Sequence, residues 1–188
     1  MGRWQPGARG RLGQAAMELY VERGYDQTTV ADIAQRAGLT SRTFFRYFVD
    51  KREVLFAGTD AVRDRLVAAL DAVPAEAAPL SAVAAALDAV VELVGDDRDH
   101  SRRRQQIIAT HAELQERELA KLAGWARAFA DGLRRRGVDE PAASLAAEVG
   151  VAVFRVAFER WTTGPGDRPL LDVVHDSFDR LPTVIIGG

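Results

Sequence analysis

The sequence predicts an all-α protein of about nine helices, with a helix-turn-helix unit in its N-terminal quarter. Three observations lead to this prediction. Apolar residues recur at three- and four-residue steps in almost every segment, no run alternates apolar and polar residues as a strand would, and Gly or Pro separates most helical segments. The chain has 188 residues, 47% of them hydrophobic, so it can bury a sizeable core.

The first two expected helices have clear end signals. Gly24 follows the apolar face of the first helix and can end it in a left-handed conformation. Thr29 and Asp32 have the spacing of a capping box, which predicts the start of a second helix that runs through Arg36. Gly38 then interrupts the helical pattern.

Two further capping signals define the next helices. Thr40 can cap a short helix over residues 41–47. Asp50 and Glu53 form a second capping-box pattern, which predicts one long helix over residues 51–73, and the Pro-bounded stretch 74–79 is expected to be a linker. The other helices are expected at 80–94, 101–110, 113–136, 141–162 and 169–181.

The charges are unevenly distributed along the chain. Residues 1–52 contain nine Lys or Arg and five Asp or Glu, a net charge of +4, whereas the whole chain carries −2. The remaining residues therefore carry −6. A basic N-terminal quarter on an acidic body favours a nucleic-acid contact confined to one end of the molecule.

Several kinds of site lack their sequence signals. The chain has no cysteine, which excludes disulfides and thiolate metal sites and fits a reducing cytoplasm. Its three histidines, His100, His111 and His175, have no ligand spacing, so no metal is expected. Without a catalytic motif or a phosphate-binding glycine loop, we expect no enzyme and no cofactor. Without a signal peptide or a near-continuous run of 18 apolar residues, we expect a cytoplasmic protein with no membrane contact.

Residues 29–48 have the spacing of a helix-turn-helix. Ala34 is small where the two helices would cross, and Gly38 lies four residues later, where the turn requires a positive φ. Such a unit presents its second helix to the major groove of DNA. The segment TTVADIAQRAGLTSRTFFRYFVDKREVLF resembles the DNA-binding signature of TetR-family transcriptional regulators, and the resemblance covers about residues 9–56.

That resemblance implies the domain organisation. Residues 1–50 would form the helix-turn-helix domain that binds DNA, and residues 51–188 a helical bundle that binds an effector and forms a homodimer, with helix 51–73 connecting the two. Family members are usually repressors that release a near-palindromic operator when a small molecule binds. The resemblance therefore implies a ligand-responsive repressor.

The candidates for contact with double-stranded DNA are Thr29, Arg42, Thr43, Phe45, Arg46, Tyr47 and Lys51. Arg42 and Thr43 lie in the first turn of the recognition helix, where side chains reach base edges, or they are only a solvated pair. Thr29, Tyr47 and Lys51 are candidates for phosphate contacts, and Arg46 contacts a phosphate or faces solvent. Many family members have Gly where Arg42 stands and Tyr where Phe45 stands. Phe45 lacks a hydroxyl for a phosphate, so its contact would be apolar, for example with a thymine methyl.

An effector pocket in the second domain needs an apolar lining with a few polar anchors. The candidates are Leu87, Val91, Arg103, Arg104, Ile107, Ile108, Trp125, Phe129, Phe154 and Phe158. Each apolar member could equally belong to a tightly packed core. The arginine run at 102–104 meets an anionic ligand or simply faces water.

The effector class and the dimer follow from the C-terminal segments. ATHAELQERELAKLAGWARAFADGLRRRG resembles the C-terminal domain of a TetR subgroup associated with acyl-coenzyme-A-like ligands, which implies a small apolar or acyl-CoA-like effector. The last two helices have apolar faces that would form a four-helix interface between two protomers, or would only complete the monomer's core. These faces contain Leu145, Val149, Val153, Val156, Trp161, Leu170, Val174 and Phe178.

Two other functions stay open at this point. A small-molecule-binding protein could keep the helix-turn-helix as a purely structural element, although the basic N-terminal quarter argues against this. An all-helical enzyme could use a cavity in the second domain, although no nucleophile, base and orienting group form a recognisable set.

Overall fold

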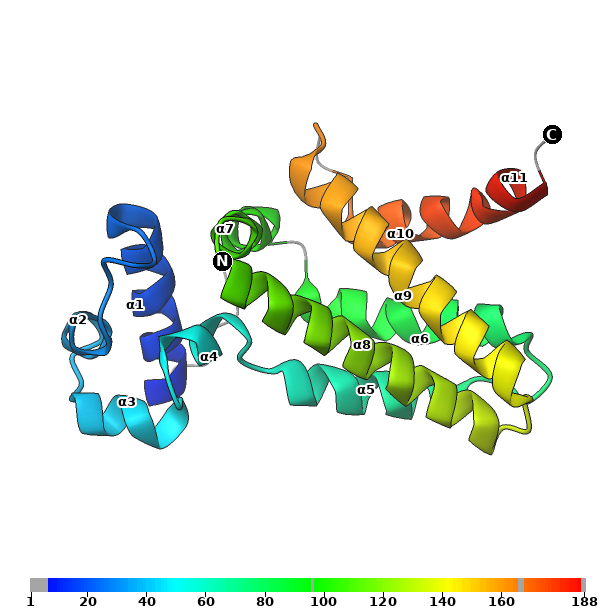
Figure 1. Ribbon diagram of the computed structural model, residues 1–188, viewed down its shortest axis with the longest axis horizontal. Helices are drawn as coiled ribbons and strands as arrows, with labels where there is room; N and C mark the ends of the chain where they lie inside the picture. Colours follow the sequence, from blue (N-terminus) through cyan, green and yellow to red (C-terminus); the bar gives the residue numbers. More distant parts are fainter. Residues whose placement is uncertain (1–6, 96, 166–167, 187–188) are drawn as a thin grey trace. The chain divides into compact units, whose positions relative to one another are not determined.

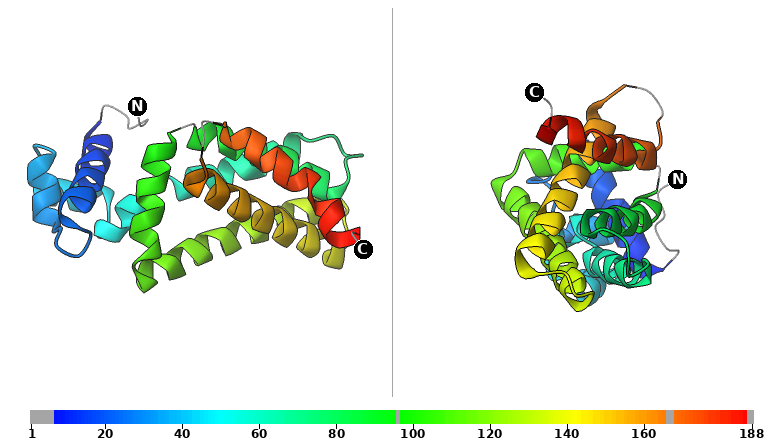
Figure 2. Two further views of the ribbon diagram at one scale, coloured as in Figure 1. Left: turned by 90° about the horizontal axis from the view of Figure 1, so that it is seen from above. Right: turned by 90° about the vertical axis from the view of Figure 1, so that its right-hand side faces the viewer.

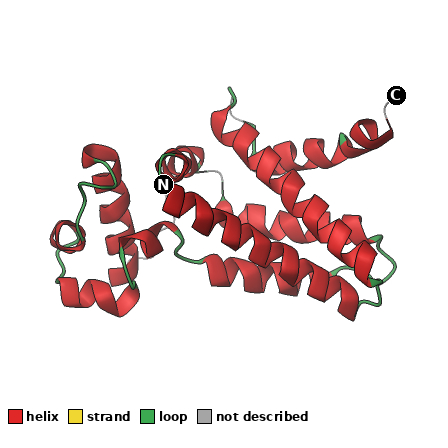
Figure 3. Cartoon of the chain, in the orientation of Figure 1, coloured by secondary structure: helices red, strands yellow, loops and turns green. Residues whose placement is uncertain are grey.

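The computed structural model describes residues 7–95, 97–165 and 168–186, and within these ranges the chain is entirely helix and loop (Figure 3). The all-α prediction is therefore confirmed. The helices are α1 Ala8–Arg23, α2 Val30–Arg36, α3 Ser41–Tyr47, α4 Lys51–Leu55, α5 Thr59–Ala72, α6 Pro79–Val94, α7 Arg98–Ala109, α8 Ala112–Arg135, α9 Glu140–Thr163, α10 Leu170–Asp179 and α11 Leu181–Ile186. The described residues form two more helices than the nine expected, because residues 51–73 form two helices and α11 follows α10.

The single helix expected over residues 51–73 was wrong, and a long-range contact explains the break. In a continuous helix the carbonyl oxygen of Leu55 would accept a hydrogen bond from the N–H four residues later. Here Arg104 Nε on α7 donates to that oxygen at 2.7 Å, and the Arg104 guanidinium lies over the Phe56 ring, 5.2 Å from its centroid. Gly58 then has φ +90°, a value outside any α-helix, and α5 begins one residue later.

The chain divides into two compact units, which are described separately. Unit 1 consists of Met1–Gly58 and Asp99–Gln115, and unit 2 of Thr59–Arg98 and Glu116–Gly188. Unit 1 therefore combines α1 to α4 with nearly all of α7 and the first turn of α8 (Figure 1).

The core of unit 1 holds the helix-turn-helix on α1. Leu12, Ile33, Phe44 and Phe48 are almost fully buried there, and Ile108 from α7 is buried in the same cluster. At the turn between α2 and α3, Gly38 has the expected positive φ, +67°. The turn is closed by hydrogen bonds from Gly38 N to Gln35 O and from Leu39 N to Ala34 O, at 3.0 and 2.8 Å.

Unit 2 is a helical bundle in which α6 packs against α5, α9 and α10 (Figures 1 and 2). Its core includes Leu66, Leu70, Leu87, Phe129, Leu133 and Leu170. The helices approach closely at two glycines. A Cβ built on Gly150 of α9 would lie 2.3 Å from Val83 Cγ1 of α6, and one on Gly132 of α8 would lie 2.5 Å from Leu70 Cδ2 of α5.

Helix α9 is the one helix of the described residues that is long and apolar enough to cross a membrane by length and composition alone. Its most apolar window has a mean hydropathy of 1.5, although no near-continuous run of 18 apolar residues was expected in the chain. A buried core helix meets the same criteria, and α9 contributes Ala147, Phe154 and Trp161 to the core of unit 2. The composition of α9 is thus weak evidence for a membrane span.

Candidate nucleic-acid interface

Helix α3 is held by side chains at its start and by two buried rings. Thr40 Oγ accepts a hydrogen bond from Thr43 N at 3.2 Å, as a helix N-cap does, and the Thr40 and Thr43 hydroxyls lie 3.0 Å apart. Phe44 and Phe48 are 0% and 2% exposed, and their ring centroids lie 5.4 Å apart. One face of α3 therefore packs into the core and leaves the opposite face in solvent.

The solvent face of α3 presents Arg42, Phe45 and Arg46. Phe45 is 58% exposed, yet its ring packs edge-to-face on Phe44, with centroids 5.6 Å apart and an interplanar angle of 84°. Arg46 lies over the ring of the half-buried Tyr47, 4.9 Å from its centroid, and donates a hydrogen bond to the Tyr47 hydroxyl at 3.0 Å. Arg46 and Tyr47 thus form one positively charged polar group at the edge of α3.

Arg42 differs from most other basic residues of unit 1. Among the described residues, no side chain or carbonyl forms a hydrogen bond or ion pair with its guanidinium. By contrast, Arg36 forms ion pairs with Glu22 at 2.7 Å and Glu18 at 3.4 Å, and Arg52 pairs with Asp50 at 2.6 Å. Arg42 therefore keeps its full donor set for an external partner.

Thr29 is occupied by the predicted capping box, which the structure confirms. Its hydroxyl donates to Asp32 Oδ2 at 2.5 Å, its N–H donates to the same oxygen at 2.9 Å, and Asp32 N donates to its Oγ at 3.2 Å. The hydrogen bonds from Thr29 hold the pKa of the Asp32 carboxyl below its ordinary value. Thr29 stays exposed to solvent at the start of α2.

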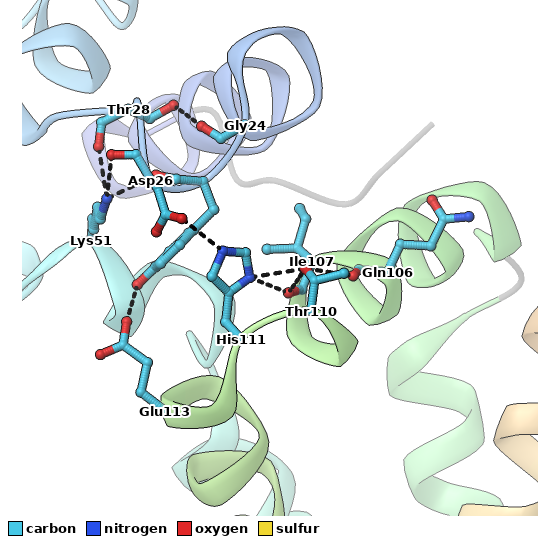
Figure 4. Close-up of polar contacts among 10 residues, drawn as sticks. Gly24, Asp26, Thr28, Lys51, Gln106, Ile107, Thr110, His111 and Glu113 are labelled. Atoms are coloured by element: carbon cyan, nitrogen blue, oxygen red, sulfur yellow. Dashed lines mark hydrogen bonds and ion pairs between the residues drawn. The ribbon is translucent and has the colours of Figure 1, made fainter.

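Lys51 points its ammonium into unit 1 rather than into solvent. Nζ donates to the carbonyl oxygens of Tyr25 at 2.8 Å, Thr28 at 3.0 Å and Asp26 at 3.4 Å (Figure 4). It also lies 4.3 Å from the centroid of the Tyr25 ring. Three carbonyls of the α1–α2 loop therefore share the charge that the sequence analysis assigned to a DNA phosphate.

The same loop contacts the corner between α7 and α8, within unit 1. The Tyr25 hydroxyl donates to Glu113 Oε1 at 3.2 Å, and Glu113 pairs with Arg52 at 3.3 Å. His111 Nε2 lies 3.5 Å from the Asp26 carboxylate, and its Nδ1 lies 2.8 Å from the carbonyl oxygen of Ile107 (Figure 4). Burial and the nearby Glu113 carboxylate raise the pKa of Tyr25, so its hydroxyl stays a donor.

These contacts could not be predicted from the sequence. Tyr25 and Glu113 are 88 residues apart, and Tyr20, whose hydroxyl donates to the Lys51 carbonyl oxygen at 2.6 Å, is 31 residues from its partner. No local spacing or cap signals such a pair. The loop between α1 and α2 is thus positioned by α4 and by the α7–α8 corner together.

The structure distributes the ten predicted pocket residues over two units. Leu87, Val91, Trp125, Phe129, Phe154 and Phe158 lie in or against the core of unit 2. Arg103, Arg104, Ile107 and Ile108 lie on α7 in unit 1, where Ile108 belongs to the core and Ile107 packs against it. Arg103 is exposed, and Arg104 is occupied by Leu55 and Phe56 as described above.

A cavity of about 310 Å³ lies elsewhere in unit 2, between the C-terminal end of α9 and the start of α10. It is lined mainly by three arginines, Arg98, Arg160 and Arg168, together with Trp161 and Val173. None of the ten predicted pocket residues lines this cavity. In the described part of the chain, no group of three or more His, Asp or Glu is placed to hold a metal ion.

The predicted dimer residues divide by exposure. Val153, Trp161, Leu170 and Val174 are at most 7% exposed, and Phe178 packs against the core of unit 2. Leu145 and Val156 are 66% and 44% exposed, and Val149 is partly exposed between them on α9. Leu145, Val149 and Val156 on α9, together with the partly buried Phe178 on α10, therefore keep apolar surface outside the core of unit 2.

Two family models match successive parts of the chain. Residues 13–57 match the family model of bacterial regulatory proteins of the tetR family, and residues 77–185 match that of the MftR C-terminal domain. The chain is 40% identical over 88 residues to the transcriptional regulator TcmR of Streptomyces glaucescens, a match that covers 47% of this chain and 39% of TcmR. It is 27% identical over 153 residues to the putative mycofactocin biosynthesis transcriptional regulator MftR of Mycobacterium tuberculosis, covering 80% and 77% of the two chains.

The fold also matches solved structures. The repressor FadR of Thermus thermophilus, solved in complex with lauroyl-CoA, has a TM-score of 0.58 to this chain, with 21% identity and 92% of each chain covered. At this level of identity the likeness describes the arrangement of helices.

Proposed function

Because the chain belongs to the TetR family of bacterial transcriptional regulators, we propose that it is a homodimeric cytoplasmic repressor, released from a near-palindromic operator by a small effector. The observation that carries the DNA-binding part of this proposal is the division of α3. Phe44 and Phe48 fasten one face to the core of unit 1, and Arg42, Phe45 and Arg46 occupy the solvent face. A recognition helix in the major groove requires this division.

Each residue of the solvent face receives a separate role. Arg42, in the first turn of α3 and with its donors free among the described residues, reads a base edge, for example the two acceptors of a guanine. Phe45 supplies an apolar contact to a thymine methyl. Arg46, with the Tyr47 hydroxyl, binds a phosphate, and the exposed Thr29 reaches a phosphate beside it. Thr43 helps Thr40 to start α3 and lies where a base edge is within reach.

The proposal is tested by selecting operator fragments from genomic DNA and measuring their binding at several salt concentrations. We expect sequence-specific binding that weakens steeply with salt, because phosphate contacts release counterions. Arg42→Ala should cost about 1–3 kcal/mol and relax the preference at one base-pair position per half-site. Arg127→Ala, an exposed arginine of α8 in unit 2, is the matched control and should leave affinity unchanged. Equal losses in both variants would contradict the assignment of Arg42.

The dimer is proposed to form through an apolar stripe on α9. Leu145, Val149, Ala152 and Val156 follow each other at steps of four, three and four residues, which is the spacing of a helix–helix seam. A two-fold pair of such helices would present two recognition helices about 34–36 Å apart, or a multiple of that distance. Leu145→Asp should convert the dimer to monomer in light scattering and abolish binding to the full palindrome. Leu119→Asp, which changes a leucine 63% exposed on α8, should stay dimeric.

The effector is proposed to be a small apolar or acyl-CoA-like molecule that binds in unit 2. The lauroyl-CoA complex of FadR, whose helix arrangement this chain shares, supports this class. In this chain, the rings of Trp125, Phe154 and Phe158 form an apolar row with centroids 5.5 and 5.8 Å apart. Titrating lauroyl-CoA into the protein–operator complex should release the DNA, and no catalytic activity is proposed.

A further inference from the structure

The indole of Trp125 on α8 is buried without a hydrogen-bond acceptor. The residue is 4% exposed, and no acceptor among the described residues lies within reach of its Nε1–H. Trp161, 3% exposed in the same core, shows the usual arrangement, since its Nε1–H donates to the Arg168 carbonyl oxygen at 3.0 Å. An unpaired buried donor is uncommon and costs about 1–3 kcal/mol. The Trp125 Nε1–H is therefore a donor that an acceptor from outside the chain could satisfy.

A second polar feature lies one turn before Trp125 on the same helix. Lys121 Nζ pairs with Glu118 Oε1 at 2.5 Å, and the two side chains are only 14% and 15% exposed. The Lys121 ammonium also lies 5.1 Å from the centroid of the Trp125 ring. Residues 118, 121 and 125 lie on one face of α8, because they are separated by three and four positions.

The surroundings of these polar groups are apolar, and the neighbouring Gly124 is partly exposed. Trp125 contacts Phe154, which stacks on Phe158 with an interplanar angle of 20°. A Cβ built on Gly124 would have no heavy atom of a neighbouring element within 4 Å, although Gly in a helix interior costs up to about 1 kcal/mol relative to Ala. A few buried polar groups in an aromatic lining are the composition of a small-molecule site.

We propose that Trp125 Nε1–H donates a hydrogen bond to the acyl carbonyl oxygen of the effector, whose hydrocarbon chain packs along Phe154 and Phe158. Lys121, held over the Trp125 ring by Glu118, adds positive charge beside the same oxygen. The effector class is an apolar acyl compound, either a thioester or a free carboxylate. This inference rests on the proposed effector-regulated function. It assigns to Trp125 the recognition of the effector's carbonyl group.

The binding experiment uses three probes with the same twelve-carbon chain and different groups at its end. Lauroyl-CoA carries a thioester carbonyl, laurate carries a carboxylate, and S-dodecyl-CoA is the thioether without a carbonyl. Calorimetry on the full-length protein should show S-dodecyl-CoA binding about tenfold more weakly than lauroyl-CoA. In a spectrum of protein labelled with ¹⁵N on the indole nitrogen, the Trp125 Nε1–H signal should move downfield with lauroyl-CoA and not with S-dodecyl-CoA. Laurate binding as tightly as lauroyl-CoA would identify the carboxylate as the source of the acceptor.

The matched variants are Trp125→Phe and Trp161→Phe, which remove the same indole volume from the same core. Trp125→Phe should weaken lauroyl-CoA about tenfold and leave S-dodecyl-CoA unchanged. Without any probe, Trp125→Phe should lower Tm less than Trp161→Phe, because only the latter breaks a hydrogen bond in the unliganded protein.

Three results would overturn the inference. They are an equal effect of Trp125→Phe on lauroyl-CoA and S-dodecyl-CoA, a larger loss of Tm for Trp125→Phe than for Trp161→Phe, or no binding of lauroyl-CoA and laurate to the unmodified protein. The operator-binding assay without probe separates these results from failure of the proposed function. A protein that binds its operator but none of the acyl probes keeps its role as a regulator and contradicts only this site.

Discussion

Replacing Lys51 by Met separates two roles that the structure and the TetR resemblance suggest for this residue. Methionine keeps an unbranched apolar stem and removes the ammonium that donates to three carbonyl oxygens of the α1–α2 loop. If the charge holds the loop, the variant loses stability. If the charge instead binds a phosphate, the variant loses affinity for DNA and keeps its stability.

The expected loss of stability follows from the contacts. Two of the three carbonyl oxygens lie within 3.0 Å of Nζ, and the third lies at 3.4 Å. Hydrogen bonds to a charged group each contribute about 1.5–3 kcal/mol to stability. Because Lys51 is partly exposed, solvent screening reduces each of its bonds to about 1.5 kcal/mol or less. The ammonium over the Tyr25 ring adds about 0.5–1 kcal/mol. We therefore expect Lys51→Met to cost about 2–4 kcal/mol, which for a chain of this size lowers Tm by about 4–16 °C.

The assay combines thermal unfolding, followed by circular dichroism, with operator binding as a function of salt. Arg42→Met is the matched control, because the Arg42 guanidinium has no partner among the described residues. It should change stability by less than about 0.5 kcal/mol and weaken operator binding strongly. Each lost phosphate contact lowers the slope of log K against log salt by about 0.9. An unchanged Tm for Lys51→Met, together with a slope reduced by about 0.9 per protomer, would refute the loop-holding role.

Two further predictions concern packing and pH. Gly150→Ala should destabilise unit 2, because its Cβ would meet Val83 Cγ1 at 2.3 Å, and such overpacking costs about 1–3 kcal/mol. The higher helix propensity of Ala offsets up to about 1 kcal/mol of this cost. Gly124→Ala should instead raise Tm, and a melting series in which both variants behave alike would contradict the close approach of α6 and α9. Hydrogen bonds from Arg36 hold the pKa of Glu22 below its ordinary value of 4.5, so the stability from this pair is present above about pH 4.5 and is lost as the pH falls through the lowered pKa. Glu22→Gln should therefore lower Tm at pH 7 and flatten the decline of Tm between about pH 5 and pH 3, and an unaltered acid profile would argue against the pair.

Local signals in the sequence were sufficient for most of unit 1. The capping box of Thr29 and Asp32, the cap of Thr40 on α3 and the positive φ of Gly38 involve residues at most a few positions apart. Such contacts form within one helical turn, so the residue types and their spacing predict them without knowledge of the rest of the chain. The division of α3 into a buried and an exposed face follows from helical periodicity in the same way.

Only the tertiary structure decided which partners the long charged side chains contact. Lys51 reaches carbonyls 23 to 26 residues away, and Arg104 takes the Leu55 carbonyl 49 residues away and thereby ends α4. Four of the predicted dimer residues are buried in unit 2, because periodicity identifies an apolar face but not the element that covers it. The sequence by itself determined a helix-turn-helix with a basic recognition helix. Packing between distant segments determined which of its charges remain available to DNA and which hold the fold together.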